Sequence, residues 1–467
     1  MKKAGAQVKT SIIILTYNEL DLTKKCLASI EKHTQEEDIE LIIVDNGSTD
    51  GTLEYLAGLS SVRTILNDAN LGFAKGCNQG IEDAKGDNLL FLNNDTMVTQ
   101  NWLSAMLRVL DQSDQTGMVG PVSNYVSGAQ MIPNAYQTLE EMEPFAKAHC
   151  EKEKHKTKRV LRLVGFCLLI KRAVIDEIGG FDERFAYGSF EDDDLCLRAI
   201  QAGYSLEIAL DSFVHHHGHA TFTANREINI NHLYTANRQR FIDKWGTDFT
   251  YFTHPRPEIV QLVPPEANRI LDIGCGAGAT GLELMNRQSC ELYGVELHPL
   301  AAKAARSHYK AVIEEDVEQA QMPYPEGFFD VIIFADILEH LKDPWTVIQT
   351  YAKYLAPSGC MVCSIPNISH AEALFPLLLG DWTYRDAGIL DRTHLRFFTP
   401  QTVHTLFPAE QFEIKAQTYN IVDVDVKVQL FFNEIARLAR ALSFPVTQLA
   451  DQCSIYQILI RAEKKAE

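Results

Sequence analysis

IELIIVDNGSTDGT, residues 39–52, and NRILDIGCGAGATG, residues 268–281, follow one pattern. Each is an apolar run that ends in an acid, followed by a turn of small residues and the start of a helix. Ligands of open α/β sheets bind beyond the carboxyl ends of strands, where backbone N–H groups and a helix N-terminus can bind a nucleotide. Because the two stretches lie far apart and have different residues downstream, the sequence predicts two nucleotide-using sites in one chain.

The composition excludes several classes of protein. Hydrophobic residues make up 46% of the 467 residues, enough for sizeable cores, and the net charge of −19 argues against nonspecific nucleic-acid binding. No apolar run reaches about 18 residues, and the N-terminus lacks a signal-peptide pattern. The cysteines are scattered through apolar segments, and the lone Cys360–Cys363 pair is either a zinc pair or two core thiols. We expect a reduced, cytoplasmic protein.

Strand and helix patterns alternate along two stretches of the chain. In the first, we expect strands at residues 9–17, 40–46, 62–67 and 88–94 and helices at 21–33, 51–59, 72–85 and 101–111. Such alternation predicts an α/β fold of two doubly wound domains. We expect a first domain at 8–223, a helical and Pro-rich linker at 224–265, and a second domain at 266–464 with a helical insertion at 428–443. Residues 127–160 are expected to be irregular, either a solvated loop or a lid.

Polar residues follow four strands of the first domain. Thr16-Tyr17-Asn18-Glu19 ends the first predicted strand, and Asp45 ends the second, where its carboxylate could accept from a pyrimidine imide N–H. NLGFAKGCN, residues 70–78, offers glycines for close backbone approach. FLNNDTMV, residues 91–98, ends another strand, and four histidines lie within residues 215–219.

These segments resemble family 2 glycosyltransferases of the GT-A fold over about residues 8–222, and residues 70–78 are similar to rhamnosyltransferase-like members. The resemblance implies a nucleotide-diphosphate sugar donor, a dTDP- or UDP-sugar, and a divalent cation, Mg²⁺ or Mn²⁺. Asn93 replaces the first acid of the family's Asp-x-Asp motif, so Asp95 supplies the carboxylate and His217 or His216 a second ligand. The histidines have an alternative reading as a polar strand end. The implied donor-binding residues are Thr16, Tyr17, Asn18, Glu19, Asp45, Asn46, Ser48, Asn70, Gly72, Phe73, Asn78, Asn93 and Asn94.

FEDDDLCLR, residues 190–198, begins a helix with four acids. Acids near a helix N-terminus are stabilised by the helix dipole, which is a purely structural explanation. The family's Glu-Asp-x-Asp pattern maps onto Glu191, Asp192 and Asp194. It implies Asp192, beside Glu191, as the general base of an inverting transfer.

The second stretch has two interpretations. Gly274, Gly276 and Ala279 satisfy a loose dinucleotide fingerprint, which a dehydrogenase would share. The order of the following elements resembles class I S-adenosylmethionine-dependent methyltransferases, and the terminal strand pair fits their reversed last strand. The residues that this resemblance assigns to S-adenosylmethionine are Asp272, Gly274, Cys275, Gly276, Gly278, Glu296, Asp316 and Asp336.

The acceptor side of the second domain is less specific. GDWTYRDAGILDRTHLRFFT, residues 380–399, is similar to a subgroup acting on small molecules and glycans, and Asp391 and His394 are the catalytic candidates there. His340 follows the predicted cofactor strand, and each of the three is equally compatible with a structural hydrogen bond. The amphipathic helix at 428–444 either packs on the domain core or presents a peripheral membrane or partner face.

The pairing of domains indicates one function. We expect an enzyme of bacterial surface polysaccharide biosynthesis in the cytoplasm, either free or bound peripherally at the inner face of the membrane. It would glycosylate a hydroxyl of a glycan or glycolipid and methylate the same glycan. One alternative is that one domain is a docking module, which the departure at Asn93 suggests for the first domain. The other is that the methyl acceptor is an unrelated small molecule. A non-enzymatic scaffold would leave both turns unexplained.

Overall fold

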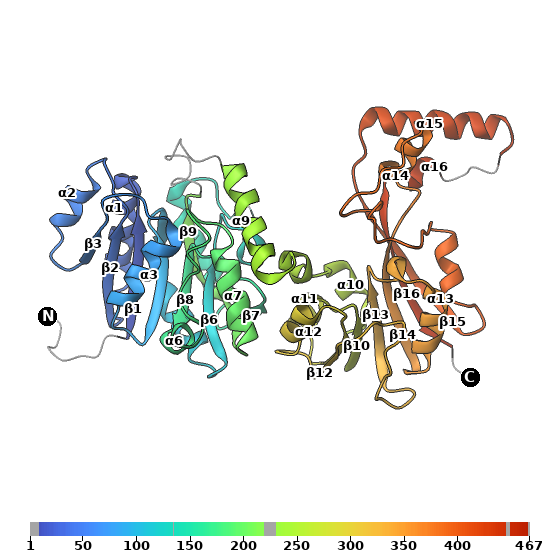
Figure 1. The fold of residues 1–467 in the computed structure, drawn as a ribbon, viewed down its shortest axis with the longest axis horizontal. Coiled ribbons are helices and arrows are strands. Elements are labelled where there is room, and N and C mark those ends of the chain that lie inside the picture. Colours follow the sequence, from blue (N-terminus) through green and yellow to red (C-terminus); the bar gives the residue numbers. More distant parts are fainter. Residues whose placement is uncertain (1–8, 134, 219–229, 445–448, 466–467) are drawn as a thin grey trace. The chain divides into compact units, whose positions relative to one another are not determined.

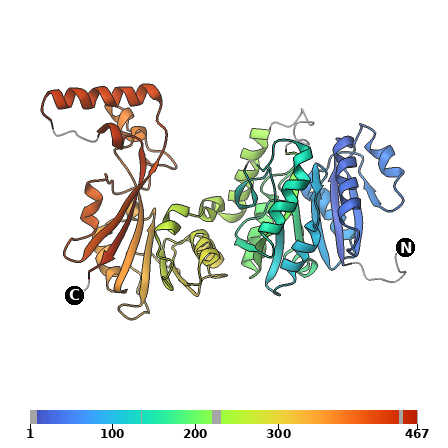
Figure 2. The ribbon, with the colours of Figure 1, turned by 180° about the vertical axis from the view of Figure 1, so that it is seen from behind.

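Two units, Met1–Thr253 and His254–Glu467, make up the chain, and each has its own sheet and core. The computed structural model describes residues 9–133, 135–218, 230–444 and 449–465. In each unit helices cover a central sheet (Figures 1 and 2). The prediction of two α/β domains is confirmed.

The first unit is built on a nine-stranded sheet of order β3-β2-β1-β4-β8-β6-β9-β5, with β7 paired to β9. The strands β3, β2, β1 and β4 are parallel, whereas β8 runs antiparallel to both of its neighbours. The register pairs Thr16 with Asp45, so the polar carboxyl ends of β1 and β2 lie side by side. The strands are β1 (Thr10–Thr16), β2 (Ile39–Asp45), β3 (Arg63–Leu66), β4 (Asn88–Asn93), β5 (Thr96–Val98), β6 (Thr116–Val122), β7 (Thr157–Val160), β8 (Cys167–Lys171) and β9 (Ser205–His216).

Helices bury both faces of this sheet, which is why its central strands are continuous apolar runs rather than alternating patterns. Trp102 of α4 is fully buried, and its indole N–H donates to Thr34 Oγ1 at 3.1 Å. The predicted helices of the first 110 residues are all present. The helices of the unit are α1 (Leu20–His33), α2 (Thr52–Ala57), α3 (Phe73–Asp83), α4 (Trp102–Leu110), α5 (Met142–Lys152), α6 (Arg172–Ile178), α7 (Glu191–Gln201) and α9 (Ile230–Trp245).

Residues 127–160, expected to be irregular, contain α5 and β7 and two short 3₁₀ turns, Gly128–Gln130 and Leu139–Glu141. The expectation is wrong because α5 buries only Met142 and Ala146, which is too sparse an apolar pattern to reveal a helix in the sequence.

The segment predicted as a linker, residues 224–265, is divided between the two units. α9 packs on the first unit, where Phe241 is 1% exposed against Phe185 and Phe190. The amide of Asn237 donates to the carbonyl of Gly188 at 2.7 Å. α10 (Pro257–Leu262) belongs to the second unit, in which Ile259 is fully buried. The expected boundary between residues 223 and 224 lies outside the described residues.

The second unit has a seven-stranded sheet of order β12-β11-β10-β13-β14-β16-β15. Its strands are parallel except β16, which runs antiparallel to β14 and β15, as the reversed last strand predicts. Cys360 and Cys363 are buried in β14 as core thiols. The strands are β10 (Arg269–Ile273), β11 (Glu291–Val295), β12 (Ala311–Ile313), β13 (Phe329–Ala335), β14 (Leu355–Pro366), β15 (Phe412–Ile421) and β16 (Ile455–Lys464).

A small helical cluster lies beyond the carboxyl end of β14 (Figure 1). There α15 covers the expected insertion at 428–443 and buries Phe432 and Ala436 against α14 and α16. The other face of α15 stays exposed. The helices of the unit are α10, α11 (Ala279–Arg287), α12 (Pro299–Ala305), α13 (Pro344–Ala352), α14 (Ala371–Leu378), α15 (Val426–Ala441) and α16 (Leu449–Gln452), with 3₁₀ turns η3 (Phe249–Thr253, first unit), η4 (Leu338–His340) and η5 (Thr402–Leu406).

Phe241→Ala and Ile259→Ala test the assignment of the divided segment. We expect each to cost about 2–5 kcal/mol through lost burial and a residual cavity. This corresponds to a fall of roughly 4–20 °C in the melting temperature of one unit. Calorimetry of the full chain should show that the two substitutions lower different transitions. If both lower the same transition, α9 and α10 belong to one unit.

Candidate active sites

The turn after β2 is held by Asp45. This residue is fully buried, and its carboxylate accepts four hydrogen bonds: from the N–H groups of Gly47 and Ser48 and from the hydroxyls of Ser48 and Thr16. Its oxygens are turned into the fold and bind the turn, and the contact between Asp45 and a pyrimidine stays a prediction. Thr16 is likewise buried.

An asparagine network surrounds this turn. The side chain of Asn46 donates to the carbonyl of Gly72 at 3.2 Å and to Asn70 Oδ1 at 3.3 Å. Asn18, with a positive φ of 56°, donates its N–H to Ser48 Oγ at 2.7 Å and accepts from the N–H of Thr49. Tyr17 and Glu19 flank it, both half-buried. The predicted donor-binding residues Asn18, Ser48, Asn46, Asn70 and Gly72 thus lie together.

Two other predicted donor-binding residues have a different position. Asn78 brackets the backbone of Phe181, donating to its carbonyl and accepting from its N–H, both at 2.9 Å. The ring of Phe73 packs edge-on against Phe181, with ring centroids 5.6 Å apart. Both residues therefore join α3 to the loop of residues 179–183.

The end of β4 meets the histidines at the end of β9. Asp95 is 4% exposed, with Oδ1 3.2 Å from His216 Nε2, and its carbonyl accepts the N–H of His217. Asn94 is buried and donates to Thr23 Oγ1 at 3.0 Å, while Asn93 ends the strand half-buried. The predicted metal residues Asp95, His216 and His217 are therefore brought together, and His219 lies outside the described residues.

The three described histidines have different electrostatic environments. Burial lowers the pKa of His215 to about 4. Burial also lowers the pKa of His217. For His216, burial opposes ionisation, but the neighbouring Asp95 carboxylate outweighs it and raises the pKa above its usual value. His216 Nδ1 faces the carbonyl of Tyr125 at 2.8 Å, so Nδ1 carries a proton and Nε2 faces Asp95. A neutral His216 would offer this Nε2 to a cation.

The four acids of α7 have separate partners. Asp194 is fully buried and binds Arg198, Lys244 and Trp245 Nε1, with donors at 2.6–2.9 Å. Asp193 pairs with Arg162; burial and Asp192 raise the pKa of Asp193 to about 6.

Asp192 and Glu191 are the two acids of α7 that were predicted to be catalytic. Asp192 is 6% exposed, and its two oxygens accept the N–H groups of Gly165 and Asp193, both at 2.9 Å. One buried carboxylate oxygen of Glu191 has no hydrogen-bond partner, and burial together with Asp192 raises its pKa well above the usual range.

Residues 165–166 join these groups into one site. Gly165 binds Asp192 through its N–H, the carbonyl of Phe166 accepts the N–H of Asn93, and the ring of Phe166 stacks on His216 with centroids 5.2 Å apart. Asp192, at the start of α7, is therefore connected through two residues to the Asp95–His216 pair.

In the second unit, three glycines form the turn after β10. Gly274, Gly276 and Gly278 all have positive φ, of 69°, 56° and 84°, a conformation that favours glycine. Glu296, at the end of β11, accepts the N–H of Gly276 at 2.8 Å and that of His298 at 2.7 Å. Cys275 is buried within the turn.

Asp272 lies beneath this turn, 2% exposed, and accepts from the hydroxyl of Tyr309 at 2.7 Å. Burial raises its pKa to about 7. Two further predicted cofactor residues bind their own surroundings: Asp316 accepts the N–H of Glu318 at 2.9 Å, and Asp336 pairs with Arg256 at 2.8 Å. Asp316 is half-buried three residues after the end of β12, whereas Asp336 is bound to Arg256 in the segment before α10.

The predicted acceptor residues do meet. Thr393 Oγ1 donates to Asp391 Oδ1 at 2.6 Å and lies 3.0 Å from His340 Nδ1, while the rings of His340 and His394 are 4.7 Å apart. Glu339, which sequence reasoning missed, lies beside them, 2% exposed, and burial raises its pKa well above the usual range. The Glu-His pair in LEHLKDP was the available signal.

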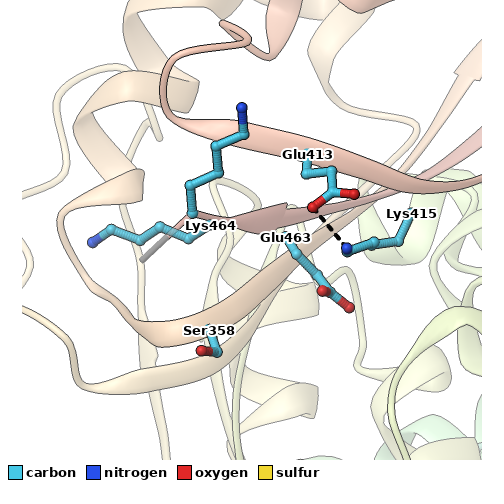
Figure 3. Close-up of a pocket in the computed structure, with 6 residues that line it drawn as sticks. Ser358, Glu413, Lys415, Glu463 and Lys464 are labelled. Carbon is cyan, nitrogen blue, oxygen red and sulfur yellow. Dashed lines mark ion pairs between the residues drawn. The ribbon is translucent and has the colours of Figure 1, made fainter. Parts of the chain in front are cut away.

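A surface hollow of the second unit is lined mainly by charged residues from β15 and β16, including Glu413, Lys415 and Glu463 (Figure 3). The amine of Lys415 pairs with Glu413 at 2.7 Å. The hollow includes Ser358 near the start of β14. It therefore lies at the amino ends of the parallel strands, whereas the glycine turn lies at their carboxyl ends.

The two halves of the chain are similar to two different families of proteins. The model of glycosyl transferase family 2 matches residues 11–179, and that of a methyltransferase domain matches residues 234–417. Glycosyltransferase AglE of Haloferax volcanii is 29% identical over 206 residues, which cover 43% of this chain and 64% of that protein.

Two further relatives match one half each. An N-acetylglucosaminyl-diphospho-decaprenol L-rhamnosyltransferase of Mycobacterium tuberculosis is 26% identical over 238 residues, 45% of this chain and 76% of that protein. A ubiquinone biosynthesis O-methyltransferase of Psychrobacter arcticus is 31% identical over 142 residues, 28% of this chain and 54% of that protein. The chain thus spans less than two thirds of AglE and of the methyltransferase.

Gly278→Ala and Gly380→Ala form a matched pair that tests the glycine turn. Both positions have φ near 85°, so each alanine costs about 1–2 kcal/mol in backbone strain. A Cβ at residue 278 would also lie 2.3 Å from His308 Nε2, whereas nothing lies within 4 Å of one at residue 380. We expect thermal unfolding to show about 1–3 kcal/mol of additional destabilisation for Gly278→Ala. Equal effects would contradict the tight turn.

Proposed function

We propose that the chain is a bifunctional enzyme, because the model of glycosyl transferase family 2 matches residues 11–179 and that of a methyltransferase domain matches residues 234–417. The first unit would transfer a sugar from a nucleotide-diphosphate donor to a hydroxyl with inversion. The second would methylate a hydroxyl with S-adenosylmethionine. The observation that carries the proposal is the connected set of Asp192, residues 165–166, His216 and Asp95.

In the proposed sugar transfer, Asp192 takes the proton of the acceptor hydroxyl. The hydroxyl oxygen then forms a bond to the anomeric carbon, and the bond from that carbon to the donor's phosphate oxygen breaks. The electron pair leaves with the nucleoside diphosphate, and attack on the opposite face inverts the carbon. The N–H groups of Gly165 and Asp193 hold the carboxylate of Asp192 in place.

A divalent cation fits the other end of this site. Asp95 and His216 bring an oxygen and a nitrogen within 3.2 Å, and Nε2 of His217 is buried without a hydrogen-bond partner. When bound, Mg²⁺ or Mn²⁺ would neutralise charge on the departing diphosphate. The imidazole nitrogens of His216 and His217 would thus replace, as cation ligands, the acid that the family has at the position of Asn93.

In the proposed methyl transfer, the glycine turn and Glu296 hold the cofactor and the 391–394 segment faces the acceptor. The acceptor oxygen bonds to the methyl carbon while the carbon–sulfur bond breaks, and its electron pair stays on sulfur. The hydroxyl proton passes to a base, for which Asp391 and His394 are the predicted candidates. Positioning of the two reactants is the main contribution of such a site.

The acceptor is proposed from the relatives. One relative is named for transferring L-rhamnose to a decaprenol-linked diphosphosugar and another for O-methylation in ubiquinone synthesis. We propose a glycan or glycolipid acceptor in bacterial surface polysaccharide synthesis, a dTDP- or UDP-sugar donor, and one acceptor shared by both units. The rival proposal, that the first unit only docks a glycan, rests on Asn93.

Asp192→Asn separates these proposals. We expect sugar transfer to fall about 10²–10⁴-fold, because the general base is lost, while donor binding is retained. Methyl transfer by the same preparation is the internal control and should be unchanged. Retained sugar transfer would show that the base is another residue.

An exposed apolar surface in the second unit favours a peripheral membrane contact. Among the described residues, no helix is long and apolar enough to cross a membrane. The α14–α15 surface, defined by Leu377, Leu378, Leu379, Leu430, Leu438 and Leu442, has side chains 47–69% exposed. Lys427, Arg437 and Arg440 also lie on α15, against one acid, Glu434. Apolar and basic side chains on one helix are typical of binding to a lipid surface.

The double substitution Leu430→Ser/Leu438→Ser tests this contact. We expect affinity for vesicles of mixed neutral and anionic lipid to fall at least tenfold, because two leucine side chains no longer enter the lipid. Sedimentation with vesicles measures it. Leu66→Ser, which is 59% exposed on the first unit, is the control and should bind as the unsubstituted protein does. Equal binding by all three proteins would exclude this surface as the contact.

A further inference from the structure

Glu339, His340 and His394 form a cluster in the second unit that the proposed reactions do not fully use. Glu339 and His340 end the 3₁₀ turn after β13, and His394 comes from the loop before η5. One carboxylate oxygen and one ring nitrogen from each histidine lie within 4.8 Å of one another. Glu339 is 2% exposed, yet neither of its oxygens has a hydrogen-bond partner. A buried, ionised carboxylate left this way is costly unless a proton or a cation neutralises it.

The tautomer of His394 follows from its partner. Nδ1 of His394 lies 2.9 Å from the carbonyl oxygen of Ile389, which can only accept. Nδ1 therefore carries the proton, and Nε2 of the neutral ring presents a lone pair.

The tautomer of His340 follows from a chain of two hydrogen bonds. The hydroxyl of Thr393 donates its one proton to Asp391 Oδ1 at 2.6 Å. It must therefore accept from His340 Nδ1, 3.0 Å away, which leaves Nε2 of His340 with its lone pair. A histidine that binds a metal usually donates its other N–H to a carbonyl or a carboxylate, and both rings have this arrangement.

We propose that Glu339, His340 and His394 bind a divalent cation of the zinc type. Two imidazole nitrogens and one carboxylate match the three protein ligands of open zinc sites, whereas Mg²⁺ and Ca²⁺ prefer oxygen ligands throughout. Thr393, Asp391 and the carbonyl of Ile389 orient the two rings from outside. This site is separate from the Asp95–His216 pair, which belongs to the first unit.

The cluster lies next to the glycine turn. A Cβ on Gly274 would come within 3.1 Å of the side chain of Ile337, two residues before Glu339. A role in catalysis rests on the proposed methyl transfer: an acceptor hydroxyl at the open position of the cation would release its proton to water more readily. In that case His394 holds the cation and does not take the proton.

Cobalt binding tests the site without measuring catalysis. The full chain, stripped with a chelator, is titrated with Co²⁺ and followed by visible absorption, in which four-coordinate Co²⁺ has intense bands. We expect these bands in the unsubstituted protein and in Asp95→Asn, which alters only the first unit. In the Asp95→Asn background, which removes the other proposed cation site, Glu339→Gln and His394→Gln should lose them, and His404→Gln, which removes an exposed histidine of the same unit, should keep them.

Thr393→Val keeps the test decisive if a ligand variant fails to fold. Thr393 is exposed, so its loss spares the core, and we expect Co²⁺ affinity to fall about 10–100-fold because His340 loses its orienting partner. Absence of the bands from the unsubstituted protein, or their persistence when Glu339→Gln is combined with Asp95→Asn, would overturn the proposal. S-adenosylmethionine binding, measured by calorimetry on the same samples, shows separately whether the methyltransferase proposal fails.

Discussion

Buried carboxylates that accept hydrogen bonds from the backbone of a neighbouring turn determine the shape of both sites. Asp45 accepts from the N–H groups of Gly47 and Ser48, and Glu296 accepts from that of Gly276. A turn at a strand end has N–H groups without sheet or helix partners, and each one left unpaired in the interior would cost about 1–3 kcal/mol. The acids satisfy these groups and so fix the turn in position. What remains for a ligand is backbone and asparagine amides at the first turn and backbone at the glycine turn.

The parts of the fold that depend on local apolar patterns could be predicted from the sequence. The strands ending at Thr16, Asp45 and Asn93 are buried on both faces, and that burial makes their apolar runs legible. By contrast, α5 has only two buried residues, and the sequence shows α9 as a helix but not that Asn237 and Phe241 pack it on the first unit. The sequence is limited in the same way for the site residues. The order of acids indicates a site, but which oxygen faces inward depends on the turn around it, as Asp45 shows.

Four consecutive acids at the start of α7 would repel one another if all were ionised in one environment. The structure separates them: Asp194 binds the cations of Arg198 and Lys244, and Asp193 faces Arg162. Since these two are committed to packing, the helix dipole and the cations account for half of the motif. Asp192 and Glu191 have no such cation partner, and Asp192 accepts the N–H of Gly165. The motif is thus partly structural and partly chemical.

Both proposed reactions remove a proton from a hydroxyl, and the groups that would promote this step differ between the two units. In the first unit the carboxylate of Asp192, which two backbone N–H groups hold in place, would do so, while positive charge is needed elsewhere, at the departing diphosphate. In the second unit the leaving group is a neutral thioether, so no cation is needed there. Positive charge at Glu339, His340 and His394 would therefore act on the acceptor instead. The two proposed cation sites, at the end of β9 in one unit and beyond β13 in the other, would thus serve the partner of each reaction that carries negative charge.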